Sequence, residues 1–259
     1  MRDDDVSAGA QTVDRACAVL REIAHHGTDG ARLVDLTRAC QLPRPTVHRI
    51  LQSLIAAEFV CQPVGVKRYK IGVGIFALGL AAHNPIEHLP ALRRLLDGLA
   101  EDIGDTAYLW MRRGDEMLCI ARSEGATPIR IHVIEVGALR PMGASLSGIT
   151  LMAAMSDDEV EVILRRTSVA MKALRNVSPS YARSQIALAR QHGYCHSDSV
   201  FIKGAYGVAV AVPAKDGRPT IAVTSSSLTA RVPKSRVKAL AAAITHTCKA
   251  MAEVVGDMA

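Results

Sequence analysis

Aromatic residues and long apolar runs are both scarce in this sequence of 259 residues. Aromatic side chains make up 3% of it, which counts against a platform on which the bases of single-stranded nucleic acid stack. No apolar run reaches the length that spans a membrane, and the acidic start from Met1 to Asp5 does not resemble a secretion signal. We therefore expect a cytoplasmic protein with no membrane partner.

Cysteine pairs of the kind that bind metals or form redox motifs are also missing. No two cysteines are spaced as C-x-x-C, and none lies at zinc-ligand spacing from a pair of histidines. We expect reduced and mostly buried thiols that behave as small hydrophobic groups, and neither a metal nor a cofactor. The cysteines are Cys17, Cys40, Cys61, Cys119, Cys195 and Cys248.

Catalytic and cofactor-binding motifs are incomplete. Gly72–Ala77 fits the pattern G-x-G-x-x-A, but the preceding strand belongs to a hairpin, and no acidic residue ends a second parallel strand. Gly143–Ser147 lacks the second glycine of G-x-S-x-G, and no Asp and His complete a triad. The scattered histidines are best interpreted as surface or helix-end residues. The sequence therefore predicts that the protein is not an enzyme.

Composition and length indicate a folded protein with two domains. Apolar residues make up 49% and charged residues 22% of the chain, which argues against disorder. A chain of 259 residues is longer than one hydrophobic core usually serves. We expect a flexible tail at 1–10, a first domain at 11–72, a linker helix at 73–84 and a larger domain at 85–259.

Three helices are expected in the first domain, at 11–26, at 33–40 and from Pro43 onward, and the third is the most informative. Apolar residues recur on it at helical spacing from Val47 to Ile55 and form a core face. The opposite face carries hydrogen-bond donors and no acid, as a surface that meets phosphates and base edges requires. The exposed donors include Arg44, Thr46, His48, Arg49 and Ser53.

Two strand-like runs at 58–62 and 67–71 follow this helix and are joined by a turn at 63–66. Three helices and a hairpin with basic residues at its tip make a winged helix-turn-helix. Residues 32–70 carry a net charge of +5, whereas the whole chain carries +6. We therefore expect double-stranded DNA as a partner, contacted by the third helix and, on its backbone, by Lys67 and Arg68.

Two alternatives for the first domain stay open at this stage. The same face can be the solvated side of a helical module that binds proteins. The domain can also be an accessory to a small-molecule-binding enzyme, although the sequence shows no pair of nucleophile and base that such an enzyme needs.

The larger domain is predicted to be α+β. A hairpin is expected at 106–121 around Arg113–Asp115, a strong turn signal. An antiparallel sheet with helices on either side follows from this pattern. Further strands are expected at 129–134, 204–212 and 220–227, and helices at 87–103, 146–155, 157–166, 179–192 and 233–255.

The whole chain from 11 to 255 resembles the IclR family of bacterial transcriptional regulators. The segments that carry the resemblance are Thr12–Leu20, Leu42–Leu51, Arg68–Gly72, Pro141–Gly148 and His192–Tyr194.

The resemblance implies a winged helix-turn-helix joined by a linker helix to a GAF-like effector domain. Members bind palindromic operators as dimers or dimers of dimers. They act as repressors or activators, and we expect this protein to be a repressor. The implied effector is a small organic or aromatic acid. Many members have a Cys where this chain has Gly207. The neighbouring Tyr206 can alter the polarity of the pocket. The implied effector-binding residues are Gly143, Ala144, Asp198, Thr224 and Ser226.

Two further residues are candidates for contact with an acidic effector. Arg130 and His132 share one face of their expected strand because side chains alternate with period two. They can neutralise an acid, or they can form a solvent-facing edge. Backbone N–H groups where a loop enters a helix, such as those of Gly143 and Ala144, also bind carboxylates well.

Overall fold

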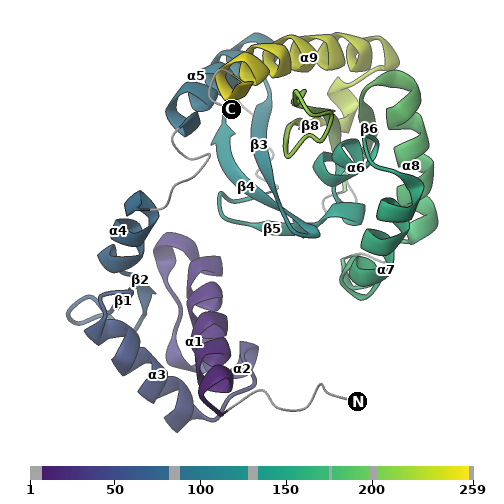
Figure 1. Ribbon diagram of the computed structural model, residues 1–259. Coiled ribbons are helices and arrows are strands. Elements are labelled where there is room, and N and C mark those ends of the chain that lie inside the picture. Colours follow the sequence, from purple (N-terminus) through teal and green to yellow (C-terminus); the bar gives the residue numbers. More distant parts are fainter. Residues whose placement is uncertain (1–7, 82–87, 128–133, 175–176, 199–202, 257–259) are drawn as a thin grey trace. The chain divides into compact units, whose positions relative to one another are not determined.

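The chain forms two compact units, residues 1–84 and 85–259 (Figure 1). Each unit has its own hydrophobic core. Within the part that the structure describes, no helix is both long and apolar enough to cross a membrane. The computed structural model describes residues 8–81, 88–127, 134–174, 177–198 and 203–256.

The first unit contains the three predicted helices, a short hairpin and a further helix. The helix α1 begins at Ala8 instead of Gln11, so the expected tail of ten residues is too long. Alanine is the strongest helix former, and Ala8 and Ala10 extend the helix toward the N-terminus. The elements are α1 (Ala8–His25), α2 (Leu33–Ala39), α3 (Arg44–Ala56), β1 (Val60–Cys61), β2 (Lys70–Ile71) and α4 (Val73–Ala81).

The predicted core face of α3 is confirmed. Val47 and Leu51 are fully buried, and Ile50 and Leu54 nearly so. They pack in one cluster with buried residues of α1 and α2, among them Val19, Ile23 and Leu36. Because this face is fixed in the core, the opposite face of α3 must point to solvent.

The hairpin is shorter than predicted, because β1 and β2 pair over two residues each. The residue just before β2 makes a second pairing outside the named strands. Ala31 and Tyr69 exchange backbone hydrogen bonds of 2.9 and 2.8 Å. Gly30, next to this bridge, has a φ of +72°, and a Cβ there would lie 2.7 Å from the carbonyl oxygen of Tyr69. Only glycine fits this position without a shift of the backbone.

The second unit is an antiparallel sheet with helices on both faces, which confirms the predicted α+β class. Six strands of the described residues lie in the order β5-β4-β3-β8-β7-β6. The strands are β3 (Thr106–Arg113), β4 (Glu116–Ser123), β5 (Leu139–Pro141), β6 (Cys195–Asp198), β7 (Ala205–Ala211) and β8 (Ile221–Leu228). The helices are α5 (Leu89–Ile103), α6 (Leu146–Met152), α7 (Asp157–Ala173), α8 (Pro179–His192) and α9 (Lys234–Gly256).

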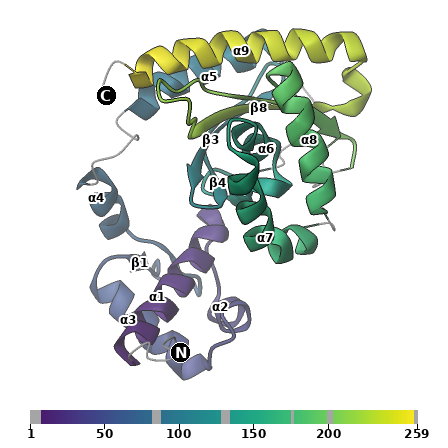
Figure 2. The same ribbon diagram turned by 45° about the vertical axis from the view of Figure 1, so that its right-hand side comes forward.

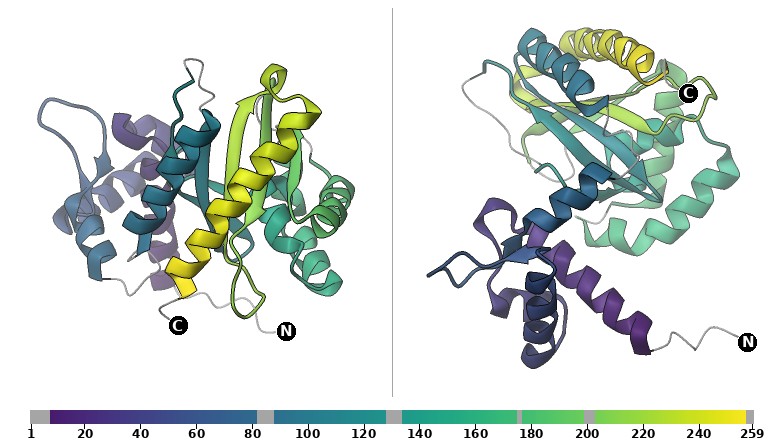
Figure 3. Two further views of the ribbon diagram at one scale, coloured as in Figure 1. Left: turned by 90° about the horizontal axis from the view of Figure 1, so that it is seen from above. Right: turned by 60° about the vertical axis from the view of Figure 1, so that its left-hand side comes forward.

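Alternate residues of the strands serve two separate cores. Leu109, Val208 and Val223 face α5 and α9, which lie along one side of the sheet (Figures 2 and 3). Trp110 and Ala209 face the opposite side, which α6, α7 and α8 cover. The period of two in a strand thus decides which layer each side chain enters.

Several boundaries differ from the sequence prediction. The helix α6 ends at Met152 instead of residue 155, and α7 continues to Ala173 instead of residue 166. The short strands β5 and β6 were not predicted, because three or four residues without a run of β-branched or aromatic side chains give no strand signal. Residues 129–133 of the expected strand 129–134 lie outside the described residues.

A buried carboxylate links the start of β3 to β8 and to α9. Asp105, 5% exposed, accepts hydrogen bonds from Ser227 Oγ at 2.6 Å and from the Arg236 guanidinium at 2.7 Å. Arg231 lies 3.2 Å from its other oxygen. Ser227 belongs to β8 and Arg236 to α9, so one side chain ties the start of β3 to both.

We predict that Asp105→Ala lowers the free energy of unfolding by roughly 2–3 kcal/mol, because the arginine and hydroxyl donors lose a buried charged partner. Urea denaturation measures the change. The control Asp102→Ala removes an exposed carboxylate on α5 and should change stability by no more than about 0.5 kcal/mol. Equal stabilities of the two variants would contradict the role assigned to Asp105.

Candidate functional sites: a basic helix face and a pocket beside the sheet

The outer face of α3 presents the predicted donors to solvent. Arg44, His48, Arg49 and Ser53 are exposed, and Thr46 is half-buried. Ser53 Oγ donates to the carbonyl oxygen of Arg49 at 3.3 Å, so its lone pairs point outward. The face therefore combines guanidinium, imidazole and hydroxyl groups and contains no carboxylate within α3, which is the chemistry that phosphates and base edges require.

The two hairpin residues that are predicted to contact DNA, Lys67 and Arg68, are placed differently. Lys67 is exposed in the loop between β1 and β2, which extends away from the three helices in the right panel of Figure 3. Arg68 is half-buried, and its guanidinium donates to the carbonyl oxygen of Gly30 at 2.9 Å. Arg68 thus braces the base of the loop, and Lys67 is the cation that points freely to solvent.

The helix α4 is apolar and yet has no buried residue in the described chain. Val73, Phe76 and Leu80 are 66%, 65% and 73% exposed. An apolar helix with several large side chains exposed is unusual in a monomeric protein and marks an interaction surface.

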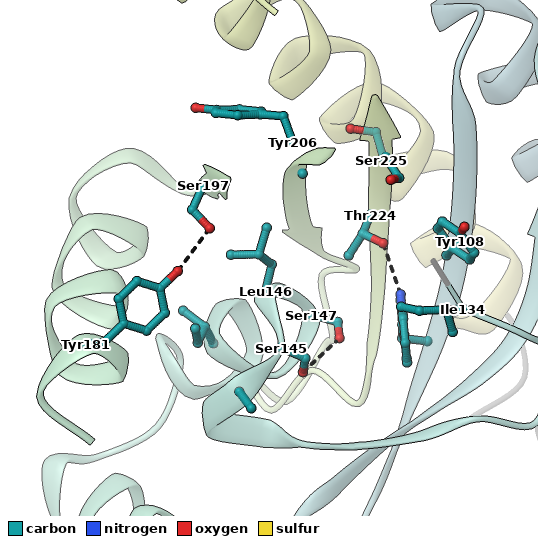
Figure 4. Close-up of a pocket in the computed structure, with 15 residues that line it drawn as sticks. Tyr108, Ile134, Ser145, Leu146, Ser147, Tyr181, Ser197, Tyr206, Thr224 and Ser225 are labelled. Carbon is teal, nitrogen blue, oxygen red and sulfur yellow. Dashed lines mark hydrogen bonds between the residues drawn. The ribbon is translucent and has the colours of Figure 1, made fainter. Parts of the chain in front are cut away.

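The second unit contains a pocket between the sheet and the helices α6 and α8, with a volume of about 70 Å³ (Figure 4). Tyr108 and Trp110 of β3 form one wall, and Thr224 and Ser226 of β8 form the floor. The opposite side is lined by the N-cap and helix of α6, by α8 and by β6. The lining residues on this side are Ser145, Leu146, Ser147, Ile149, Tyr181 and Ser197.

Three hydrogen bonds connect polar side chains of the pocket lining. Trp110 Nε1 donates to Thr224 Oγ1 at 3.0 Å, and Ser147 Oγ donates to Ser145 Oγ at 3.2 Å. Tyr181 and Ser197 are joined at 2.9 Å, as the dashed lines of Figure 4 show. Burial raises the pKa of Tyr181 above its usual value, so its phenol stays protonated at neutral pH.

Three of the effector-binding residues expected from the sequence line this pocket: Ala144, Thr224 and Ser226. Gly143 lies behind the wall, where a Cβ would meet Leu164 and Met171 of the core.

The pocket does not include the other expected residues. Ser197 points into it, so Asp198, the next residue of β6, lies on the opposite face of the sheet, where it accepts a hydrogen bond from Thr229. Arg130 and His132 lie outside the described residues.

Tyr206, beside Gly207, is one of the lining residues, but its hydroxyl has a partner of its own. The Tyr206 hydroxyl bonds to His196 Nδ1 at 2.5 Å, and its ring points away from the other labelled side chains in Figure 4. Gly207 itself lines the pocket, and a Cβ there would lie 2.8 Å from the end of the Leu146 side chain. The glycine thus leaves space that Leu146 fills.

The aromatic wall and the Tyr181–Ser197 pair were not predicted from the sequence. Ser145 could have been found, because it is the N-cap of α6 and accepts a bond from the Gly148 amide at 3.1 Å. Tyr108 and Tyr181 carry no local signal, since strands and helices place such residues in any core.

All six cysteines are free, as predicted, but only three are buried. Burial raises the pKa of Cys119 and of Cys248 to about 12 and raises that of Cys195 further, so these thiols stay protonated and unreactive. Cys61, in β1, is exposed, contrary to the expectation of mostly buried thiols. No group of three metal-binding side chains occurs in the described parts of the chain.

Two family models match consecutive parts of the sequence. The model for the IclR helix-turn-helix domain matches residues 12–63, and the model for the bacterial transcriptional regulator IclR C-terminal region matches residues 84–253. The chain belongs to the IclR family. This family consists of transcriptional regulators, so the protein is a DNA-binding regulator and not an enzyme.

Relatives and solved structures agree with this membership over nearly the full length. The acetate operon repressor of Salmonella typhimurium is 26% identical, covering 94% of this chain and 89% of its own. Transcriptional repressor IclR of Escherichia coli is 25% identical, covering 96% and 91%. The fold is similar to an IclR transcriptional regulator from Alicyclobacillus acidocaldarius, with a TM-score of 0.78 at 21% identity over 94% of this chain and 98% of that one.

We predict that Lys67→Ala weakens the binding of this IclR-family protein to all DNA sequences about equally. Loss of one phosphate contact should lower the slope of log affinity against log salt by about one unit. Fluorescence anisotropy with a labelled duplex at several salt concentrations measures this slope. Lys238→Ala, which removes an exposed lysine of α9, is the matched control. A changed sequence preference with an unchanged slope would show that Lys67 contacts bases instead.

Proposed function

We propose that this protein is a cytoplasmic repressor that binds a palindromic operator as a homodimer or a dimer of dimers and is controlled by a small organic molecule. The exposed, acid-free face of α3 carries the proposal. The similar proteins named above are called repressors, which supports repression as the sign of regulation.

The proposed DNA contacts divide into two groups. Arg44, Thr46, His48, Arg49 and Ser53 enter the major groove on α3, where bidentate arginine contacts read guanine. Lys67 and the outer edge of Arg68 contact the flanking phosphates. The first group sets the sequence that is bound, and the second group sets the dependence on salt.

Control by a ligand requires that the pocket and the DNA surface be coupled. A ligand that prefers the conformation with low DNA affinity weakens operator binding, and by linkage operator DNA weakens ligand binding by the same factor. Typical coupling energies are about 1–3 kcal/mol. In this proposal the ligand of the pocket prefers the conformation with low DNA affinity and acts as an inducer.

We predict that Arg49→Ala weakens binding to the operator about tenfold to hundredfold, because one base contact is worth about 1–3 kcal/mol. The test is a mobility-shift assay with the intergenic DNA upstream of the protein's own gene, with scrambled DNA as competitor. Arg94→Ala, which removes an exposed arginine of α5, is the control. Unchanged sequence-specific binding by the Arg49 variant would contradict the assignment. Failure of the unsubstituted protein to bind any specific DNA would favour a protein-interaction role for the first unit.

The homodimer is proposed to form through α4. The exposed side chains of Val73, Phe76 and Leu80 gain about 1.5–3 kcal/mol each when fully buried. A two-fold interface repeats these contacts, since each copy offers the same helix to the other.

We predict that Phe76→Asp shifts the protein from dimer to monomer in sedimentation velocity, because a buried carboxylate in the interface lacks a partner. Val169→Asp places the same charge at a valine of α7 that is 81% exposed and should leave the dimer intact. A monomeric unsubstituted protein would rule out the proposed interface, as would a dimer that survives the Phe76 substitution.

A further inference from the structure

The hydrogen atoms of the pocket hydroxyls can be assigned from their partners. Ser145 Oγ accepts from the Gly148 amide at 3.1 Å and from Ser147 Oγ at 3.2 Å. Thr224 Oγ1 accepts from Trp110 Nε1 at 3.0 Å. Neither hydroxyl donates to any acceptor among the described residues, although Ser145 and Thr224 are only 5% and 8% exposed. Each therefore keeps an O–H that is available to a molecule in the pocket.

Two other hydroxyls have the opposite polarity. Ser147 gives its hydrogen to Ser145. Ser197 Oγ donates to the carbonyl oxygen of Asp198 at 2.9 Å, so the hydrogen in its bond with Tyr181 comes from the tyrosine. Ser147 and Tyr181 are left with lone pairs only and can accept a hydrogen bond from a ligand.

The charge of the lining and the volume of the pocket restrict the class of ligand further. Of the side chains that the structure describes in the lining, none is charged. A carboxylate buried without a cation loses several kcal/mol of hydration and brings no hydrogen for Ser147 or Tyr181. The volume of about 70 Å³ holds about five water-sized groups.

We propose that the effector of this regulator is a small uncharged carbonyl compound with its own N–H or O–H group, such as a primary amide or a hydroxyketone. The carbonyl oxygen accepts from Ser145 and Thr224, and the N–H or O–H group donates to Tyr181 or Ser147. Leu146 and Ile149 contact the hydrocarbon part. The inference rests on the proposed function, because it identifies the ligand of the pocket assigned there.

Four probes of five non-hydrogen atoms separate the possibilities: propionamide, hydroxyacetone, propionate and butanone. Trp110 is the one tryptophan of the chain and lines the pocket, so its fluorescence reports occupancy, and calorimetry gives the affinities. We expect propionamide and hydroxyacetone to bind about tenfold more tightly than propionate and butanone, as one additional hydrogen bond or one avoided buried charge implies. Tighter binding of propionate would overturn the proposal, and so would binding of none of the four at about 10 mM.

Two substitutions test the individual contacts. Tyr181→Phe removes one acceptor and keeps the ring, so it should weaken propionamide binding about fivefold to tenfold and leave butanone binding unchanged. Thr224→Val should weaken all carbonyl probes. Ser184→Ala, which removes an exposed hydroxyl of α8, is the control and should change neither. An equal loss of propionamide and butanone in the Tyr181 variant would show a steric role and overturn the assigned hydrogen bond.

The same proteins in the mobility-shift assay separate the two levels of the proposal. If the regulator binds its operator and prefers propionate, the ligand class is wrong and the proposed function stands. If it binds propionamide as expected and no specific DNA, the ligand class stands and the proposed function fails.

Discussion

The pairing of β3 with β8 is the contact on which the second unit depends. Thr106 to Met111 align with Ser226 to Ile221 at the centre of the sheet, and the other strands of the described residues attach on one side or the other of this pair. The Trp110–Thr224 bond spans 114 residues of sequence across the same two strands. The pocket floor, both cores and the Asp105 network therefore all rely on the register of one long-range pair, in which a slip of one residue would exchange the two faces.

The first unit exposes its functional polar side chains to solvent, and the second unit buries its own. In both units the periodicity of the secondary structure places these side chains. In the first, a few buried residues on α3 fix a row of polar side chains in solvent, where they can meet a large and charged partner. In the second, aromatic and aliphatic side chains enclose hydroxyl groups away from solvent, where each hydrogen bond is stronger and each unpaired group more costly. Periodicity decides the outcome in both cases, with a period of 3.6 residues in the helix and two in the strands.

The sequence predicted what depends on local pattern. The buried and exposed faces of α3 follow from the spacing of Val47, Ile50, Leu51 and Leu54, and the hairpin of β3 and β4 follows from the turn around Gly114. The pocket is different, because its walls come from segments that are distant in the chain and meet only through the sheet. Resemblance to a family led to Ala144, Thr224 and Ser226.

Asp198 was also expected from the family resemblance, but its side chain lies on the other face of the sheet from the pocket. Ser197, the neighbouring residue of β6, faces the pocket instead. The sequence alone does not show which face of β6 the helices cover, and so it does not show which of two neighbouring polar residues enters the pocket. Tyr181 illustrates the same point, because the partner that orients its hydroxyl, Ser197, lies in a strand too short to be predicted.

The central position of the β3–β8 pair also has a consequence for synthesis of the chain. The first unit is complete within 84 residues and can fold while the rest is still being translated. The strand β3 must wait for β8, about 115 residues later, which takes roughly 6–23 s at 5–20 residues per second. During that interval the edge of β3 that pairs with β8 is open, and α5 lacks the cover of α9. The nascent chain should therefore need chaperones mainly in the interval after β3 has left the ribosome and before β8 has done so.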